Sequence, residues 1–223
     1  MTKIYLTNVT PLLNDVAFDA ALKKVHSQRY EKVNRIKHRS DKNLSLGAGL
    51  LLEYGAEDFS GNRAHSSVEL LPNGKPYLKN YPDVHFSISH SGDIALCALS
   101  DFPIGADIQL CTDFKDEICR RYFKKSETDY VAGAKTPKEK RQRFFKIWTL
   151  KEAYVKMTGK GLGQFRDFEI DLKDGISVKN SQQIKPLSFF EFDIPDYKCA
   201  LCICGEESDV KIKNINIFDL LIN

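Results

Sequence analysis

The feature that most constrains the fold is the segment FFKIWTLKEAYVKMTG, residues 144–159, which has the pattern of one long helix. Apolar side chains recur along it at helical spacing, and Gly159 stands where a helix commonly ends. Strand-like runs follow it, and we predict that they form an antiparallel sheet: residues 168–172, 176–180, 187–194, 198–205 and 210–221. A helix followed by the strands that it can cover indicates an α+β unit.

The first half of the chain shows the same order of a helix followed by strands. Residues 40–57 have a helical pattern with Ser40 as the N-cap, and residues 84–100 alternate as a β-hairpin does. Two α+β units of about 110 residues fit the length of 223 residues. We therefore predict two similar α+β subdomains packed as a pseudo-dimer, residues 1–103 and 104–223, each with an antiparallel sheet and a long helix.

The composition excludes several classes of protein. The 33 Lys and Arg residues against 30 Asp and Glu leave a net charge of +3, which is too small to indicate nucleic-acid binding. The most apolar stretch, residues 44–52, is far shorter than a membrane span, and the sequence does not begin with a signal-peptide pattern. We therefore expect a cytoplasmic protein that binds neither nucleic acid nor a membrane.

The six cysteines are too sparse in a chain of this length to form a disulfide scaffold. Cys199, Cys202 and Cys204 lie close together, but no second pair of Cys or His follows at a ligand spacing. In YKCALCIC they alternate with apolar residues, so we predict a strand of the core and not a metal site.

A first candidate site lies on the strand-like segment 104–110, which places Gly105, Asp107 and Gln109 on one face. A carboxylate and an amide oxygen on one strand face can both point at a hard cation. Mg²⁺ in particular uses one or two protein carboxylates together with waters and phosphate oxygens. The pair alone also fits a surface strand with polar outward side chains, so both interpretations stay open.

A second candidate lies on the 144–159 helix, where Trp148, Glu152 and Lys156 are spaced by four residues and line one face. Glu152 and Lys156 fit an exposed ion pair, worth a few tenths of a kcal/mol. They also fit a carboxylate for a metal and an amine for phosphate binding or proton transfer. Lys151 lies roughly 100° from Glu152 around the helix and can reach another partner.

A third candidate is Ser89-His90, at the end of a predicted hairpin strand. A histidine there can bind phosphate or exchange protons. The dipeptide alone is poor evidence for a catalytic triad, because triad members meet in space and not in sequence. The segment GKGLG, residues 159–163, follows a helix, so we predict a cap and turn instead of a phosphate-binding loop.

Four strings, in this order and spacing, resemble the Sfp-type 4′-phosphopantetheinyl transferases of the holo-acyl-carrier-protein synthase superfamily: HFSISHSGDIALCALS, PIGADIQ, RYFKKSE and FFKIWTLKEAYVKMTGKGL. The resemblance is close over residues 70–165, and its most specific part is W-x-x-K-E-x-x-x-K followed by GKG. It implies an enzyme of the holo-[acyl-carrier-protein] synthase type. Such an enzyme transfers the phosphopantetheine arm of coenzyme A to a serine of a carrier protein, uses Mg²⁺ and releases 3′,5′-ADP.

The same resemblance implies roles for individual residues. Asp107 and Glu152 match metal ligands of the family, and Gln109 occupies the place of a third. Glu152, Lys156 and His90 match catalytic residues, among which Lys156 contacts phosphate and is proposed to move protons. The matches to coenzyme A contacts are Lys75, Ser89, His90 and Lys156. Arg29 and Lys32 fall near basic family positions that bind the 3′-phosphate region of coenzyme A.

Two positions depart from the family pattern. Gln109 stands where most of these enzymes have Glu, which removes one negative charge from the ligand set. Asn43 stands where an Arg that contacts coenzyme A is common, and the adjacent Lys42 can substitute for it. Gln109 leaves open an alternative, a non-catalytic homologue that binds coenzyme A or a carrier with an impaired metal site. An unrelated α+β nucleotide-phosphate enzyme, which would not discriminate coenzyme A from dephospho-coenzyme A, is a third interpretation.

The carriers of this family are generally acidic on their recognition helix, so a rim of basic residues would suit them through electrostatic steering. The candidates lie in residues 113–134, which have a helical pattern: Arg120, Phe123, Lys124 and Lys125. Each also fits a solvated helix face. The resemblance further implies a monomer, while acyl, peptidyl and polyketide carriers all remain open as partners.

Overall fold

The computed structural model describes residues 1–61, 67–180, 185–207 and 209–222. The chain forms two compact units, which we call unit 1 (Met1–Phe102 with Glu207–Asn223) and unit 2 (Pro103–Glu206). Both combine helices with small, mainly antiparallel sheets, which confirms the predicted α+β class. Residues 104–223 were expected to form one unit, whereas in the structure the segment Glu207–Asn223 belongs to unit 1.

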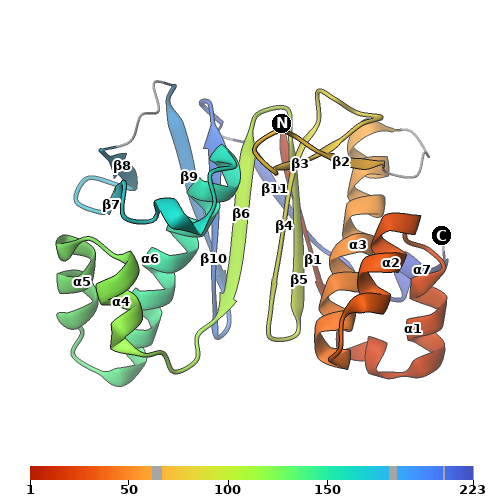
Figure 1. Cartoon of the computed structure of the whole chain (residues 1–223), viewed down its shortest axis with the longest axis horizontal. Helices are drawn as coiled ribbons and strands as arrows, with labels where there is room; N and C mark the ends of the chain where they lie inside the picture. Colours follow the sequence, from red (N-terminus) through yellow and green to blue (C-terminus); the bar gives the residue numbers. More distant parts are fainter. Residues whose placement is uncertain (62–66, 181–184, 208, 223) are drawn as a thin grey trace. The chain divides into compact units, whose positions relative to one another are not determined.

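Unit 1 is built on a four-stranded sheet with the order β11-β1-β5-β4, in which β1 and β11 are parallel and the other pairs antiparallel (Figure 1). Its elements are β1 (Thr2–Asn8), η1 (Thr10–Leu13), α1 (Asp15–Leu22), α2 (Ser27–Arg35), α3 (Arg39–Ser60), β2 (Val68–Leu70), β3 (Pro76–Leu78), β4 (His85–Ser91), β5 (Ile94–Ser100), β11 (Val210–Asn214) and α7 (Asp219–Ile222). The predicted hairpin of residues 84–100 is therefore confirmed as β4 and β5. The predicted strand 210–221 is only half right, since it ends at Asn214 and a short helix follows.

The long helix of unit 1, α3, covers β5 and β1 with apolar and small side chains, including Leu46, Leu51 and Leu52. It begins before the predicted N-cap Ser40, since His38 takes that position, and it ends where Gly61 adopts a left-handed conformation. A methyl group on Gly55 would lie 2.6 Å from Leu99 Cδ1, so α3 lies close to the sheet at this point.

Unit 2 is built on a three-stranded antiparallel sheet with the order β6-β10-β9. A separate two-stranded antiparallel ribbon, β7-β8, precedes β9 in the sequence. Its elements are β6 (Ile104–Leu110), α4 (Asp116–Tyr122), α5 (Lys125–Ala132), α6 (Pro137–Thr158), η2 (Leu162–Gln164), β7 (Glu169–Asp171), β8 (Ser177–Lys179), β9 (Leu187–Ile194) and β10 (Tyr197–Cys204). Cys199, Cys202 and Cys204 are buried in β10, which confirms the predicted core strand.

The long helix of unit 2, α6, runs along β6 and β10 (Figure 1). It begins at Pro137, earlier than predicted, because Thr136 Oγ1 accepts a hydrogen bond from Glu139 N and proline is favourable in the first turn. It ends as predicted, with Gly159 in the left-handed conformation. The predicted helix 113–134 is divided into α4 and α5 by the extended residues Phe123 and Lys124.

The closest approach of helix and sheet in unit 2 is at Gly105 on β6. A Cβ atom there would lie 2.0 Å from the Ala153 carbonyl oxygen and 2.3 Å from Met157 N, so only glycine allows α6 this near. This contact fixes which face of β6 is turned toward the helix. Within the part of the chain that the structure describes, no helix has both the length and the apolar composition that crossing a membrane requires.

Candidate active site

The side chain of Asp107 lies on the α6-facing side of β6, because it follows Gly105 by two residues in an extended strand. It is only 1% exposed. Lys156 Nζ, from α6, donates to Asp107 Oδ1 at 2.7 Å and to the Ala106 carbonyl oxygen at 3.1 Å. Gln109 Nε2 donates to Asp107 Oδ2 at 3.2 Å. Asp107, Gln109 and Lys156, predicted from two separate segments, therefore meet at one place.

Glu152 lies one helical turn before Lys156 on α6, so its carboxylate joins the same group. Burial and the neighbouring charge of Asp107 raise its pKa to about 7, and the ammonium group of Lys156 offsets part of that effect. Two carboxylates thus share a partly buried region with one ammonium group. This arrangement favours binding a cation or a proton between the carboxylates.

The donor set fits a hard divalent cation that keeps open positions. Asp107 and Glu152 supply two carboxylates, and the repulsion between them is the kind that a bound cation relieves. Among the described residues, no group of three or more His, Cys, Asp or Glu side chains forms a closed metal site. A Mg²⁺ ion held by this pair would therefore complete its coordination with water or with phosphate oxygens of a substrate, as that ion commonly does.

A buried ion pair beside this group was not identified from the sequence. Lys151 Nζ donates to Glu127 Oε1 at 2.7 Å, to Glu127 Oε2 at 2.9 Å and to the Phe168 carbonyl oxygen at 3.0 Å. Both side chains of the pair have no exposed surface. The sequence placed Lys151 on a different face of the helix from Glu152, where it could reach another partner. That partner, Glu127, lies 24 residues away on α5 and could not be identified from the sequence.

The predicted coenzyme A contacts of unit 1 lie on β4, α2 and α3 and in the turn before β3. His90 and Ser89 are at the end of β4, with His90 exposed and Ser89 buried, and Lys75 is half-buried just before β3. Lys42 is half-buried near the start of α3. Asn43, which follows it, is buried and accepts a hydrogen bond from Arg39 Nε.

Arg29 and Lys32 lie one helical turn apart on α2. Arg29 is only 8% exposed, packs against Gly49 of α3 and donates from Nη1 to Ser45 Oγ at 3.4 Å. Burial lowers the pKa of Arg29. Lys32 is at the surface, and its pKa is lowered by partial burial and by the charge of Arg29. Two cations held this close are suited to sharing one anion, with Lys32 as the accessible member.

The predicted carrier contacts in unit 2 divide into surface and core residues. Arg120 and Lys125 are exposed and form surface ion pairs with Glu117 and Asp129. Lys124 is half-buried at the start of α5. Phe123, by contrast, is a core residue, 4% exposed, in an aromatic cluster with Phe144 and Trp148. We therefore do not keep Phe123 among the surface contacts.

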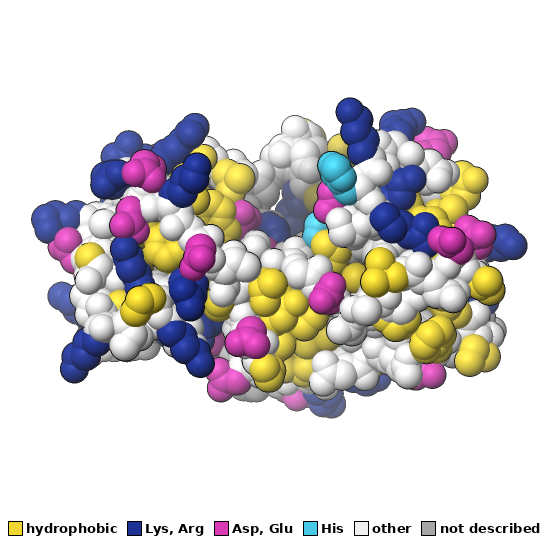
Figure 2. Space-filling model, turned by 90° about the horizontal axis from the view of Figure 1, so that it is seen from below, with side chains coloured by type: hydrophobic (Ala, Val, Ile, Leu, Met, Phe, Trp, Pro, Cys, Tyr) yellow, Lys and Arg dark blue, Asp and Glu magenta, His cyan; other side chains and the backbone are white. Residues whose placement is uncertain are grey.

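Basic side chains are spread over the face of unit 2 seen from below, on the left of Figure 2, with acidic ones between them. The surface ion pairs of α4 and α5 are consistent with this mixture, since Arg120 and Lys125 each have an acidic partner on the same helix. The face thus offers positive charge in scattered positions and not as one continuous patch.

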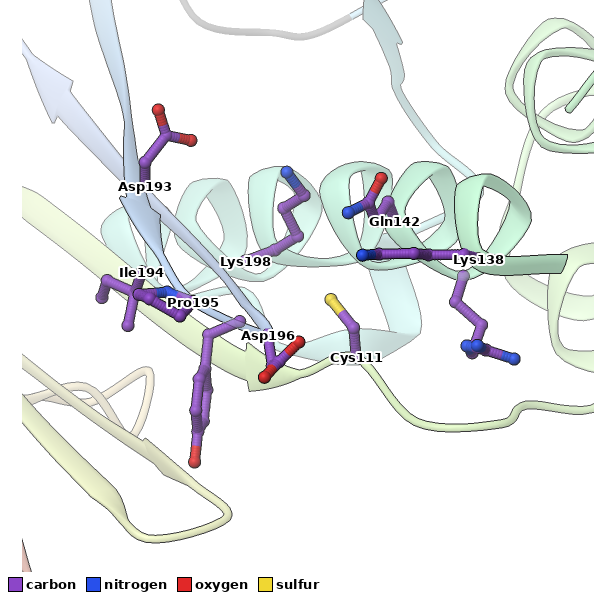
Figure 3. A pocket seen from close by; sticks show the side chains of 10 residues that line it. Cys111, Lys138, Gln142, Asp193, Ile194, Pro195, Asp196 and Lys198 are labelled. Atoms are coloured by element: carbon purple, nitrogen blue, oxygen red, sulfur yellow. The ribbon is translucent and has the colours of Figure 1, made fainter. Parts of the chain in front are cut away.

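A separate hollow of about 400 Å³ lies where the end of β6, the β9–β10 turn and the first turns of α6 meet (Figure 3). Cys111, two residues beyond Gln109, contributes to its wall. The full lining consists of Cys111, Lys138, Arg141, Gln142, Asp193, Ile194, Pro195, Asp196, Tyr197 and Lys198. Acidic and basic side chains are mixed there, so the hollow does not select one charge of ligand, and none of the predicted site residues lines it.

Comparison with known proteins adds independent information. Residues 103–202 match the family model of the 4′-phosphopantetheinyl transferase superfamily, which is nearly the whole of unit 2. A 4′-phosphopantetheinyl transferase of Bacillus subtilis is 32% identical over 206 residues, covering 90% of this chain and 91% of that protein. Another from Bacillus subtilis, ffp, is 31% identical over 225 residues, covering 98% and 100%. The L-aminoadipate-semialdehyde dehydrogenase-phosphopantetheinyl transferase of Mus musculus is 27% identical, covering 89% and 73%.

Proposed function

The chain belongs to the 4′-phosphopantetheinyl transferase superfamily, and we propose that it transfers the 4′-phosphopantetheine arm of coenzyme A to a serine hydroxyl of a carrier protein. The observation that carries this proposal is the group formed by Asp107, Glu152 and Lys156 on β6 and α6. The narrower holo-[acyl-carrier-protein] synthase activity expected from the sequence is not kept. The similar proteins from Bacillus subtilis are named 4′-phosphopantetheinyl transferases, one of them Sfp, and not holo-[acyl-carrier-protein] synthases.

In the proposed reaction, the serine oxygen bonds to the phosphorus that bears the pantetheine group. The bond from that phosphorus to the bridging oxygen breaks, so 3′,5′-ADP leaves with the electron pair, and the serine proton passes to a base. Little covalent chemistry is required of the protein, and the rate depends on positioning and on neutralising negative charge. Lys156, held by Asp107, places an ammonium group where that charge can be met.

Asp107 and Glu152, with Gln109 beside them, are the residues that we propose to hold Mg²⁺. The ion would neutralise charge on the pyrophosphate group when it is bound there. Gln109 donates its amide hydrogen to Asp107 and so supports the orientation of that carboxylate without adding a second negative charge. When no cation is bound, burial and Asp107 raise the pKa of Glu152 to about 7, which makes Glu152 one candidate to accept the serine proton.

In unit 1 we propose His90, Ser89 and Lys75 as contacts for coenzyme A, with Lys32, Arg29 and Lys42 as further basic groups. In unit 2 we propose Arg120, Lys124 and Lys125 as contacts for the carrier. A histidine and several cations suit the phosphates of coenzyme A, and exposed cations suit an acidic protein surface. The protein is further proposed to act as a cytoplasmic monomer on an acyl, peptidyl or polyketide carrier.

One observation favours a second function. Gln109 leaves the group with two carboxylates, so a homologue that binds coenzyme A or a carrier without transferring the arm is the alternative. Asp107, Glu152 and Lys156 favour the transferase, because a binding module would not need two carboxylates partly buried side by side.

The test is an intact-mass measurement on a panel of apo acyl, peptidyl and polyketide carriers with coenzyme A and Mg²⁺. A transferase adds one phosphopantetheine group to the serine of at least one carrier. Tight binding of coenzyme A without any change in carrier mass would support the binding homologue instead. Equal rates with dephospho-coenzyme A would contradict the proposed role of the basic residues of unit 1.

A further inference from the structure

The Glu127–Lys151 pair holds three elements of unit 2 together by a single buried carboxylate. Besides the two bonds from Lys151, Glu127 Oε2 accepts from Lys124 N at the start of α5, and Oε1 accepts from Ile170 N of β7. Lys151 Nζ donates its remaining bond to the Phe168 carbonyl oxygen, just before β7, and lies 4.4 Å from the centre of the Phe168 ring. All three donors of the ammonium group are therefore used.

This arrangement is costly to bury, because two charges without exposed surface lose their hydration. Buried ion pairs stabilise proteins weakly, and apolar residues of the same size often serve as well. The pair provides directional bonds that apolar packing lacks. These bonds can therefore fix the geometry of the elements that they join.

The geometry that they fix is the rotation of α6 about its own axis. Successive residues of a helix are about 100° apart, so Lys151 and Ala153 lie about 200° apart, on nearly opposite faces. The Ala153 face is held against β6 by the close approach at Gly105. The Lys151 face is held by Glu127. Glu152 lies between these two fixed faces.

A small rotation would be sufficient to misplace Glu152. A side-chain tip roughly 6 Å from the helix axis moves by about 1 Å when the helix turns by about 10°. A displacement of that size at a reacting group can reduce a rate by about 100-fold. Glu152 must also stay close to Asp107 for the two carboxylates to act together.

We propose that Glu127 and Lys151 are positioning residues, which set the place of the Glu152 carboxylate relative to Asp107 by holding the far side of α6. This inference rests on the proposed function, because it assigns the pair a role in the proposed metal-binding and transfer site. It does not make either residue a contact of the substrate.

The test uses the double variant Glu127→Gln/Lys151→Met in the full chain. Gln keeps an acceptor for one of the two backbone N–H groups that Glu127 binds, Met keeps the length of the lysine stem, and no unpaired charge remains. The matched control is Lys146→Met/Glu191→Gln, which removes the 2.6 Å ion pair between α6 and β9, at side chains that are 26% and 30% exposed. Both variants are compared with the wild type by thermal unfolding, transfer kinetics and Mn²⁺ binding.

We expect the double variant to fold, with kcat lowered by about tenfold or more and KM for coenzyme A within about twofold of the wild type. Its affinity for Mn²⁺, measured without substrate from the electron paramagnetic resonance signal of free Mn²⁺, should fall several-fold. The control should keep both values. A double variant with wild-type kcat and Mn²⁺ affinity, whatever its melting temperature, overturns the proposal.

A third readout separates this proposal from the proposed function. Trp148, the single tryptophan, lies one turn before Lys151 and contacts the Phe165 ring at 5.3 Å between centroids. Rotation of α6 should shift its emission maximum. If the wild type neither transfers nor binds Mn²⁺, the proposed function fails, and an unchanged emission in the double variant overturns the positioning role. Should the double variant not fold, Glu127→Asp, which keeps the charge and shortens the arm, is measured in the same way.

Discussion

The helices α3 and α6 are a natural comparison, because each has 22 residues and each covers the sheet of its own unit. The buried side of α3 consists of leucine, alanine and glycine with two small polar residues, Asn43 and Ser45. The buried side of α6 is also mainly apolar, yet it includes Lys151 with no exposed surface, and Glu152 and Lys156 lie half-buried beside it.

The difference shows that a helix packed on a sheet can serve stability alone, as α3 does, or can also place ionisable groups, as α6 does. Burial of apolar side chains is enough to hold a helix on a sheet, as α3 does. Ionisable groups at the same kind of interface cost free energy unless they are paired, so their presence on α6 indicates a purpose other than stability. We therefore regard α3 as the frame of unit 1 and α6 as the helix of the reaction.

The largest expected contrast is between the paired carboxylates of the two units. Asp107→Ala should reduce transfer by about 1,000-fold or more, because it removes a proposed metal ligand and the partner of Lys156. Asp58 of unit 1 accepts from Lys3 Nζ, Tyr5 OH and Lys213 Nζ, at 2.6 to 3.0 Å. Asp58→Ala should cost about 1–3 kcal/mol of unfolding free energy and leave kcat within about twofold. Transfer kinetics and urea unfolding measure both effects, and equal losses of activity would remove the contrast.

The second contrast is between two glycines at the helix–sheet contacts. Gly105→Ala should lower the unfolding free energy by about 3 kcal/mol or more, because the new methyl group meets backbone atoms of α6 that have no freedom to move aside. Gly55→Ala meets side-chain atoms of Leu99 and Tyr5, and the better helix propensity of alanine offsets about 1 kcal/mol. Its net effect should be within about 1 kcal/mol of zero. Urea unfolding measures the free energy of unfolding of both variants. A larger loss of that free energy for Gly55→Ala than for Gly105→Ala would contradict the packing described for α6.

When a chelator removes divalent metal ions, the free energy of unfolding should depend on pH through Glu152. The pKa of Glu152 is raised to about 7 in the folded state, above its ordinary value of 4.5. The protonated form therefore stabilises the fold fully below about pH 4.5, and this contribution is lost as the pH rises through 7. Between pH 5 and pH 8, the wild type should lose about 2–3 kcal/mol relative to Glu152→Gln, which has no titrating group there. Parallel stability curves for the two proteins would show that the pKa of Glu152 is not raised in the folded state.

The smallest expected effect is that of adding a carboxylate. Gln109→Glu adds a third carboxylate to Asp107 and Glu152, so the Mg²⁺ concentration for half-maximal transfer should fall by about threefold or more. Gln142→Glu, on α6 in the wall of the separate hollow, is the matched control and should leave that concentration unchanged. The same value for wild type and Gln109→Glu would mean that position 109 has no part in holding the ion.

The sequence predicted which residues meet in the candidate site better than it predicted the extent of the two units. Asp107, Glu152 and Lys156 could be found because strand and helix periods place them on defined faces, and the family motifs fix their spacing. The return of Glu207–Asn223 to unit 1 could not be found, since the parallel pairing of β11 with β1 joins the two ends of the chain. Phe123 was assigned to the surface because its basic neighbours are, but an aromatic cluster that includes Phe144 holds it in the core.

Glu127 is the residue whose burial is hardest to predict from the sequence. In the sequence it is an acidic residue in the first turn of a helix, where such residues are common at the surface. Its burial depends on Lys151 and on the backbone of β7, which come from distant parts of the chain. Pairing of this kind is set by the tertiary fold, and no local pattern reports it.

The most direct test of the central claim is the rate at which Glu152→Gln modifies an apo carrier that the wild type accepts, at saturating coenzyme A and Mg²⁺, followed by intact mass. Glutamine keeps the size of the side chain and removes only the negative charge of Glu152, while Lys156 of α6 stays paired with Asp107. We expect a folded variant that produces no detectable phosphopantetheinylated carrier. Turnover of the variant at the wild-type rate would show that the reaction does not depend on this carboxylate, and the assignment of the site would be wrong.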